Sequence, residues 1–161
     1  MGELKKQLYL LERKEVRKMV LKIEQIFVNL PVKDLEVSMD FFKKIGFEFD
    51  ERFTDEKAAC MVLGSNMYAM LLEEDFFSSF THLGIADTSK ENECILAFNV
   101  SSKEEVDTIF NKALEAGGED KSIPREEEMM YFKRIKDIDG HLWEISFMDF
   151  NQFDNTDYTI I

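Results

Sequence analysis

Cysteine, histidine and proline are scarce in this sequence, and long apolar runs are absent. The 161 residues include only two of each of these three residue types. Cys60 and Cys94 form no CxxC pair, which favours small, buried, reduced residues of a cytoplasmic protein. No apolar run is long enough to cross a bilayer, and the N-terminus has no secretory pattern, so we expect no membrane partner.

Positive charge is also in short supply. Twenty Lys and Arg stand against 33 Asp and Glu, which gives a net charge of −13. Residues 1–22 hold seven basic and three acidic side chains, so the remainder is even more acidic. Such a body repels phosphate and argues against a nucleic-acid partner. It is compatible with a cationic ligand, although acidic surfaces usually serve only solubility.

The length suits one domain, and its first half predicts a β-α-β-β-β order. Residues 1–22 are rich in helix formers and are expected to form an N-terminal helical extension. A buried strand follows over 23–30 and ends at Pro31. A helix then begins after Asp34, a plausible N-cap, and ends at Gly46. Further strands are expected over residues 47–53, 57–63 and 67–72.

The same order begins again after a polar connection over residues 75–93. The sequence Asn29-Leu30-x-x-Lys33-Asp34 returns as Asn99-Val100-x-x-Lys103-Glu104. A strand over 94–100 and a helix capped by Ser101 or Ser102 precede the remaining strands, at 119–123, 131–136 and after Asp139-Gly140. We therefore predict an α+β domain over residues 23–149, with modules at about 23–74 and 94–149 and a tail at 150–161.

The closing hairpin, residues 136–149 (KDIDGHLWEISFMD), contains a carboxylate within a strand. Asp139-Gly140 is a turn signal. Strand alternation then places Trp143, Ile145 and Phe147 on one side of the last strand. Leu142, Glu144 and Ser146 lie on the other side, so Glu144 is either solvent-facing or part of a site.

Three features resemble the vicinal oxygen chelate superfamily, which includes glyoxalase I, the bleomycin resistance proteins and the extradiol dioxygenases. They are the strand-to-helix passage at residues 30–47, the duplicated β-α-β-β-β unit, and the hairpin pattern DxDGHxWEI at residues 137–145. The resemblance covers about residues 23–149. It implies a curved mixed sheet around a cleft, and family metalloenzymes hold a divalent metal there with four side chains.

The resemblance also identifies the metal-ligand positions. They are Phe27, Ala69 or Met70, Ile95 or Ala97, and Glu144. Only Glu144 is a competent ligand, so we expect no metal and no other cofactor. A divalent metal would need shifted ligands such as His82, His141 or Glu73, each of which is more easily explained as structural or exposed.

Strand alternation predicts a mainly apolar pocket with a few polar groups, as a small-molecule site requires. The ligand-binding candidates are Phe27, Asn29, Met70, Ile95, Ala97, Asn99, Tyr131, Arg134 and Ser146. Glu144 is the catalytic candidate. In an apolar cleft it could act as a general base, whereas an ion pair with Arg134 would make it structural.

We therefore expect a glyoxalase-like protein that binds a small organic molecule between its modules without the full metal site. The resemblance implies a homodimer, because many family members pair two chains. One alternative is a metal-dependent enzyme with shifted ligands, either a lactoylglutathione lyase-like enzyme or an extradiol dioxygenase. Another is a resistance protein that sequesters a cationic antibiotic. Whether the chain is catalytic stays open at this point.

Overall fold

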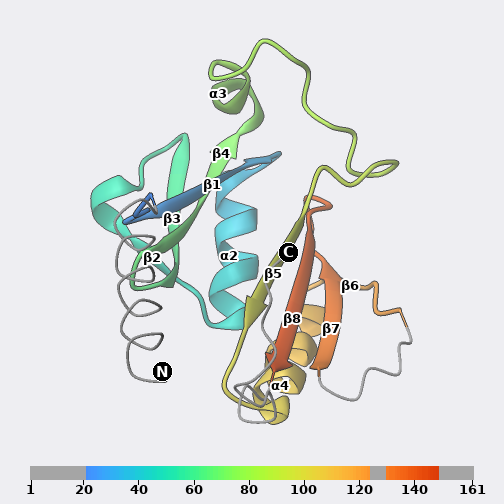
Figure 1. Ribbon diagram of the computed structural model, residues 1–161. Coiled ribbons are helices and arrows are strands. Elements are labelled where there is room, and N and C mark those ends of the chain that lie inside the picture. Colours follow the sequence, from blue (N-terminus) through green and yellow to red (C-terminus); the bar gives the residue numbers. More distant parts are fainter. Residues whose placement is uncertain (1–20, 124–129, 149–161) are drawn as a thin grey trace, which may run out of the picture.

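The computed structural model describes residues 21–123 and 130–148, and it contains both predicted modules (Figure 1). The α+β class and the β-α-β-β-β order are confirmed. Module 1 comprises β1 (Ile26–Val32), α2 (Leu35–Ile45), β2 (Glu48–Asp50), the 3₁₀ helix η1 (Glu51–Phe53), β3 (Ala58–Gly64) and β4 (Met67–Glu73). Module 2 comprises β5 (Ile95–Asn99), α4 (Lys103–Glu115), β6 (Glu119–Asp120), β7 (Met130–Lys136) and β8 (Leu142–Met148). The short helix α3 (Glu74–Ser78) begins the connection, whereas the predicted N-terminal helix and C-terminal tail lie outside the described residues.

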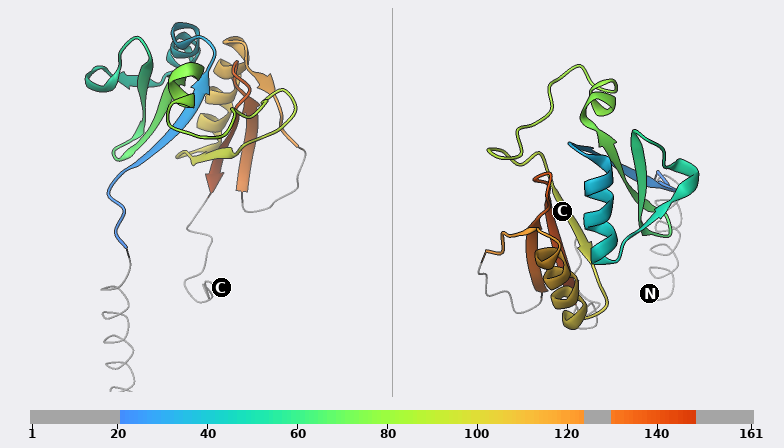
Figure 2. Two further views of the ribbon diagram at one scale, coloured as in Figure 1. Left: turned by 90° about the horizontal axis from the view of Figure 1, so that it is seen from above. Right: turned by 180° about the vertical axis from the view of Figure 1, so that it is seen from behind.

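Each module forms its own four-stranded mixed sheet. The strand orders are β1-β4-β3-β2 and β5-β8-β7-β6. In both sheets the first strand runs parallel to the last, and the remaining pairs are antiparallel. The sheets lie side by side, and the connection from α3 to β5 passes from one module to the other (Figure 2).

Both helices begin at side-chain caps. Asp34 accepts a hydrogen bond from the backbone N–H of Val37, and Ser102 accepts one from Glu105. Gly46 ends α2 with φ +120°, a conformation that glycine adopts without a Cβ clash. No helix in the described parts of the chain combines the length and apolar character needed to cross a bilayer.

Aromatic rings join the two modules into one core. The ring of Phe42 on α2 lies 5.4 Å from that of Trp143 on β8, and Phe47 lies 6.1 Å from Phe98 on β5. These pairs are edge-to-face, a geometry worth about 0.5–1.5 kcal/mol per pair beyond area burial. Figure 1 shows α2 in the middle of the molecule, where its Phe42 ring packs against module 2.

Three local expectations were wrong. The first strand continues through Pro31 to Val32, because β1 is an edge strand and its free side needs no N–H donor. The strand expected over 47–53 ends at Asp50, whose carboxylate accepts from the N–H of Arg52 and starts η1. Cys60 is buried as expected, but Cys94 is exposed at the end of the connection.

The closing hairpin clamps module 2 to the start of α2. The Asp139 carboxylate accepts from the backbone N–H of Lys33 at 2.9 Å and from Ser38 Oγ at 2.5 Å. Asp137 organises the hairpin itself, accepting from the N–H groups of Asp139 and His141 and from Trp143 Nε1 at 2.8 Å. Ser38, Asp137, Asp139 and His141 are all buried, so this network connects the modules out of contact with water.

Replacing Asp139 with Ala is expected to lower the free energy of unfolding by about 2–4 kcal/mol, because buried donors on module 1 lose a charged acceptor. Asp55→Ala is the matched control, since Asp55 also accepts two hydrogen bonds but is exposed and bonds only to Lys57 and Ala58. Urea unfolding should show a loss of about 1 kcal/mol or less for that control. Equal losses in the two variants would contradict the clamp.

Candidate functional site

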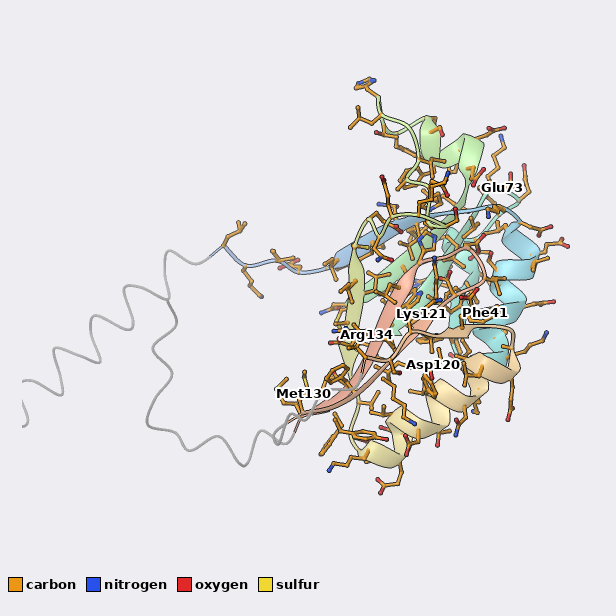
Figure 3. The ribbon with its side chains drawn as sticks, turned by 90° about the vertical axis from the view of Figure 1, so that its right-hand side faces the viewer. Phe41, Glu73, Asp120, Lys121, Met130 and Arg134 are labelled. Atoms are coloured by element: carbon orange, nitrogen blue, oxygen red, sulfur yellow. The ribbon has the colours of Figure 1, made fainter. Side chains whose placement is uncertain are left out.

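An ion pair stands on the face of the module 2 sheet that is turned away from α4. Arg134 on β7 and Glu144 on β8 are opposite each other in the ladder. The guanidinium donates from Nε to Glu144 Oε2 at 2.7 Å, and its Nη2 lies 2.5 Å from the same oxygen. The two side chains are only 16% and 13% exposed, and Figure 3 shows Arg134 beside the strands and away from α4.

The geometry of this pair leaves hydrogen-bonding capacity unused. Both contacts go to one carboxylate oxygen, so among the described residues neither Glu144 Oε1 nor Arg134 Nη1 has a hydrogen-bond partner. A ligand that offers one acceptor and one donor could bond to both atoms at once. The pair is therefore available for recognition as well as for holding β7 to β8.

The surroundings of the pair are small or apolar. Ala97 on β5 lies directly opposite Glu144, and the Arg134 guanidinium stacks over the Phe132 ring at 5.1 Å from its centroid. Ser146 is buried and its hydroxyl donates to the Phe98 carbonyl at 3.1 Å, while Asn99 lies opposite it on β5. Ser146 is thus engaged by the protein, whereas Asn99 and Ile95 are exposed on the same face.

Tyr131 does not belong to this face. Its hydroxyl donates to Asp107 on α4 at 2.7 Å, so its ring lies on the helix side of the sheet. The sequence contained the signal: Tyr131 and Arg134 are three residues apart, and strand alternation cannot place them on one face. Phe132, two residues from Arg134, is the aromatic side chain that the prediction missed.

The corresponding face of module 1 is aromatic. Phe27 on β1 and Tyr68 on β4 are ladder partners, and their rings stack with centroids 4.9 Å apart and planes 14° apart. Asn29 and Met70 form the next pair on this face. Phe27 remains 45% exposed. A flat apolar surface of this kind suits a planar organic group.

The structure therefore gathers the predicted residues into two sets, one on each sheet. Phe27, Asn29 and Met70 share module 1 with Tyr68, while Ile95, Ala97, Asn99, Arg134, Glu144 and Ser146 share module 2. No hydrogen bond, ion pair or ring contact among the described residues joins one set to the other.

The ladders also identify the residues at the four positions where family metalloenzymes carry ligands. Glu144 follows the turn glycine by four residues and is opposite Ala97. Tyr68 follows Gly64 by four residues and is opposite Phe27, so it replaces Ala69 or Met70 as the equivalent of Glu144. Ala69 is buried on the helix side. Two of these four side chains, Phe27 and Ala97, have no donor atom, and Glu144 is already bound to Arg134, so the set does not fit a divalent metal.

The residues considered as shifted ligands do not supply the missing metal ligands. His141 is 1% exposed, and both of its ring nitrogens contact protein acceptors. Glu73 ends β4 and His82 is exposed in the connection. Within the described ranges, no three His, Cys, Asp or Glu side chains form a group that could hold a metal ion.

Two hollows lie beneath the connection. The Lys136 pocket, of about 330 Å³, is lined mainly by Lys136, Leu142, Lys121, Ile123 and residues 88–92. Lys136 and Leu142 are ladder partners and form the rung next to Arg134 and Glu144 on the same face. The His141 pocket, of about 360 Å³, lies between the hairpin, Pro31, Lys33, Glu74 and residues 85–89. Residues of the connection thus border the ion-pair face.

Comparison with known proteins gives a family match and several structural matches. The family model described as the glyoxalase/bleomycin resistance protein/dioxygenase superfamily matches residues 22–145. A hypothetical protein from S. aureus is 29% identical, with a TM-score of 0.67 over 79% of this chain and 95% of that chain. A glyoxalase-related enzyme from Fulvimarina pelagi is 21% identical, with a TM-score of 0.65 over 78% of this chain and 88% of that chain. The fosfomycin resistance protein FosX from Listeria monocytogenes is 22% identical, with a TM-score of 0.57 over 81% of this chain and 94% of that chain. No curated protein matches the chain.

We expect no tight stoichiometric binding of Zn²⁺ or Ni²⁺, because the side chains at the four ligand positions supply a single carboxylate, and that carboxylate is already paired with Arg134. Equilibrium dialysis of protein prepared without chelators should give no site with a Kd below about 1 µM. Glu144→Gln should leave any weaker binding unchanged. One tightly held equivalent of metal that is lost in Glu144→Gln would contradict this assignment.

Proposed function

The chain belongs to the glyoxalase/bleomycin resistance protein/dioxygenase superfamily, and we propose that it binds a small organic molecule between its modules without a full metal site. The observation that carries this proposal is the Arg134–Glu144 pair. It is largely shielded from water, yet no described residue bonds to Arg134 Nη1 or Glu144 Oε1, so both atoms can serve a ligand. Shielding strengthens hydrogen bonds to charged groups, so this pair is a favourable anchor.

The residues around the pair indicate what kind of ligand it would take. Arg134 Nη1 donates to an oxygen and Glu144 Oε1 accepts from an adjacent N–H or O–H, which suits an amide, a hydroxy acid or a hydroxy ketone. The stacked rings of Phe27 and Tyr68 supply a wall for a planar or apolar part. In this proposal Glu144 orients the ligand, because its partner Arg134 already neutralises it.

The cationic-antibiotic alternative has less support from this face. An acidic site for a cation needs carboxylates that are not neutralised by the protein itself. Glu144 is bound to Arg134, and Lys136 stands on the next rung. The acidic charge of the chain therefore does not by itself indicate a cationic ligand.

We also propose that the protein is a homodimer whose second copy covers the exposed strands. Ile26, Met67 and Ile95 are each about half exposed, at 51%, 51% and 50%, and Phe27 is 45% exposed. β1 and β5 are edge strands with one free side each. An exposed apolar edge commonly marks an association surface.

Ligand binding is tested with two matched double variants. Arg134→Met with Glu144→Gln removes the anchor, whereas Lys133→Met with Asp107→Asn removes an ion pair of 2.7 Å on the opposite face of the same sheet. In a thermal-shift screen of catechols, glutathione adducts and cationic drugs, hits should lose at least tenfold in affinity, about 1.4 kcal/mol, only in the first variant. Equal losses would show that the anchor is misassigned, and a screen without hits in the wild type would count against the function.

Dimerisation is tested by introducing a charge on the exposed strand. Ile95→Glu should produce a monomer in sedimentation velocity, because a desolvated carboxylate at the interface has no partner. Val37→Glu is the control: Val37 is 54% exposed on α2, away from the edge strands, and its substitution should leave the dimer intact. A wild-type monomer, or dissociation in both variants, would be the contrary outcome.

A further inference from the structure

His141 is buried between two hydrogen-bond acceptors. Its Nδ1 contacts the carboxylate of Glu93, and its Nε2 lies 2.8 Å from the carbonyl oxygen of Pro31. A neutral imidazole has one N–H and could donate to only one of them. With Glu93 as a carboxylate, both contacts are satisfied only when the ring is protonated on both nitrogens, so this geometry favours the imidazolium form.

The charged groups around the ring favour the same form. Burial alone would lower the pKa of His141, but the charge of Asp137, the hydrogen bond to Glu93 and the Pro31 carbonyl together raise that pKa above its ordinary value of 6.5. Asp139 is the other carboxylate of the hairpin. The remaining charged groups on elements packed here line the His141 pocket and are Lys33, Glu74 and Asp87.

The connection is also attached to the hairpin at a second point, Thr88. Thr88 Oγ1 donates to the Asp139 carbonyl at 2.7 Å, and the Thr88 carbonyl accepts from Lys136 Nζ. A Cβ at Gly140 would collide with the Thr88 side chain, so glycine at φ +95° allows this close approach. Residues 89–94, here called the strap, run from this fastening past Glu93 to β5.

We propose that the strap is a proton-dependent cover of the Lys136 pocket, held closed by the imidazolium of His141 through Glu93. When the ring loses its proton, one contact must fail. Pro31 is part of β1 and cannot move without breaking the ladder, whereas Glu93 is 27% exposed and can return to water. Release of Glu93 leaves the strap, among the described residues, held at Thr88, at β5 and by the hydrogen bonds of residues 89–91 to Asp87, which belongs to the same connection. The connection can then shift as a unit and withdraw residues 89–92 from the pocket wall.

The sign of the pH dependence follows from the raised pKa. A group that binds its proton more tightly in the closed state stabilises that state fully below its ordinary pKa of 6.5. The stabilisation is lost as pH rises through the pKa of the folded protein. The strap is therefore closed in acid and opens toward alkaline pH, and any ligand that enters the proposed site past the Lys136 pocket gains access with rising pH.

The test uses the ligand-free full chain, so it is independent of whether the proposed function is correct. The chain has two histidines, and His82→Gln leaves His141 as the only imidazole to titrate by NMR. Hydrogen exchange of residues 89–94, corrected for its intrinsic pH dependence, should speed up several-fold as pH passes the measured pKa of His141. Fluorescence of Trp143, the single tryptophan, should stay constant because the hairpin remains folded.

Three variants separate the strap from other causes. Glu93→Gln should lower the pKa of His141 and make strap exchange fast at every pH. Glu91→Gln, in the same segment, should change neither quantity. Thr88→Val should raise exchange by the same factor at all pH values, because the bond that it removes joins an uncharged hydroxyl to a backbone carbonyl.

Two results would overturn the proposal. One is strap exchange that stays flat through the pKa of His141 or a pKa that Glu93→Gln does not lower. The other is a Trp143 emission change that accompanies the exchange change, since this would mean that the whole hairpin opens.

Discussion

The hydrogen bonds to the carboxylate of Asp139 fix the position of module 2 relative to the start of α2 in module 1. The carboxylate accepts hydrogen bonds from the backbone N–H of Lys33 and from the hydroxyl of Ser38. Both donors belong to the segment that leads from β1 into α2. That segment orients α2, and α2 presents Phe42 to Trp143 in the other module. A buried carboxylate with directional bonds specifies this arrangement more tightly than apolar contact, which tolerates sliding.

The sheet faces show how a shared scaffold can change its chemistry. The ladders of the two modules have the same order, so Phe27 with Tyr68 and Ala97 with Glu144 occupy equivalent positions. Phe27 and Tyr68 form an aromatic stack, whereas the carboxylate of Glu144 forms an ion pair with Arg134. Superfamily membership therefore indicates the location of a site here, while its chemistry has to be argued from these side chains.

Much of the fold and part of the site were predictable because alternation and capping are local rules. The duplicated order and the caps at Asp34 and Gly46 follow from residues a few positions apart. The sides taken by Glu144 and Trp143 follow from the two-residue period of a strand. The same rule, applied to Tyr131, would have placed it against α4 and identified Phe132.

Other features depend on partners distant in sequence. The strand through Pro31 depends on its edge position, and the burial of His141 depends on Glu93 and Pro31. The pairing of Arg134 with Glu144, one of two alternatives offered by the sequence, was decided by the register of β7 on β8. Neither neighbour spacing nor composition encodes these contacts, which appear only when the modules are assembled.

The hairpin combines two kinds of buried charge with opposite consequences. Each oxygen of Asp137 and Asp139 accepts from at least one uncharged N–H or O–H donor. These bonds therefore do not depend on the charge of their donors. His141 depends instead on its own second proton, and its partner Glu93 keeps partial contact with solvent. One short turn thus contains the Asp139 bonds to the start of α2, which do not depend on a proton, and the His141 contact with Glu93, which in our proposal does. The connection can therefore move while the modules stay joined.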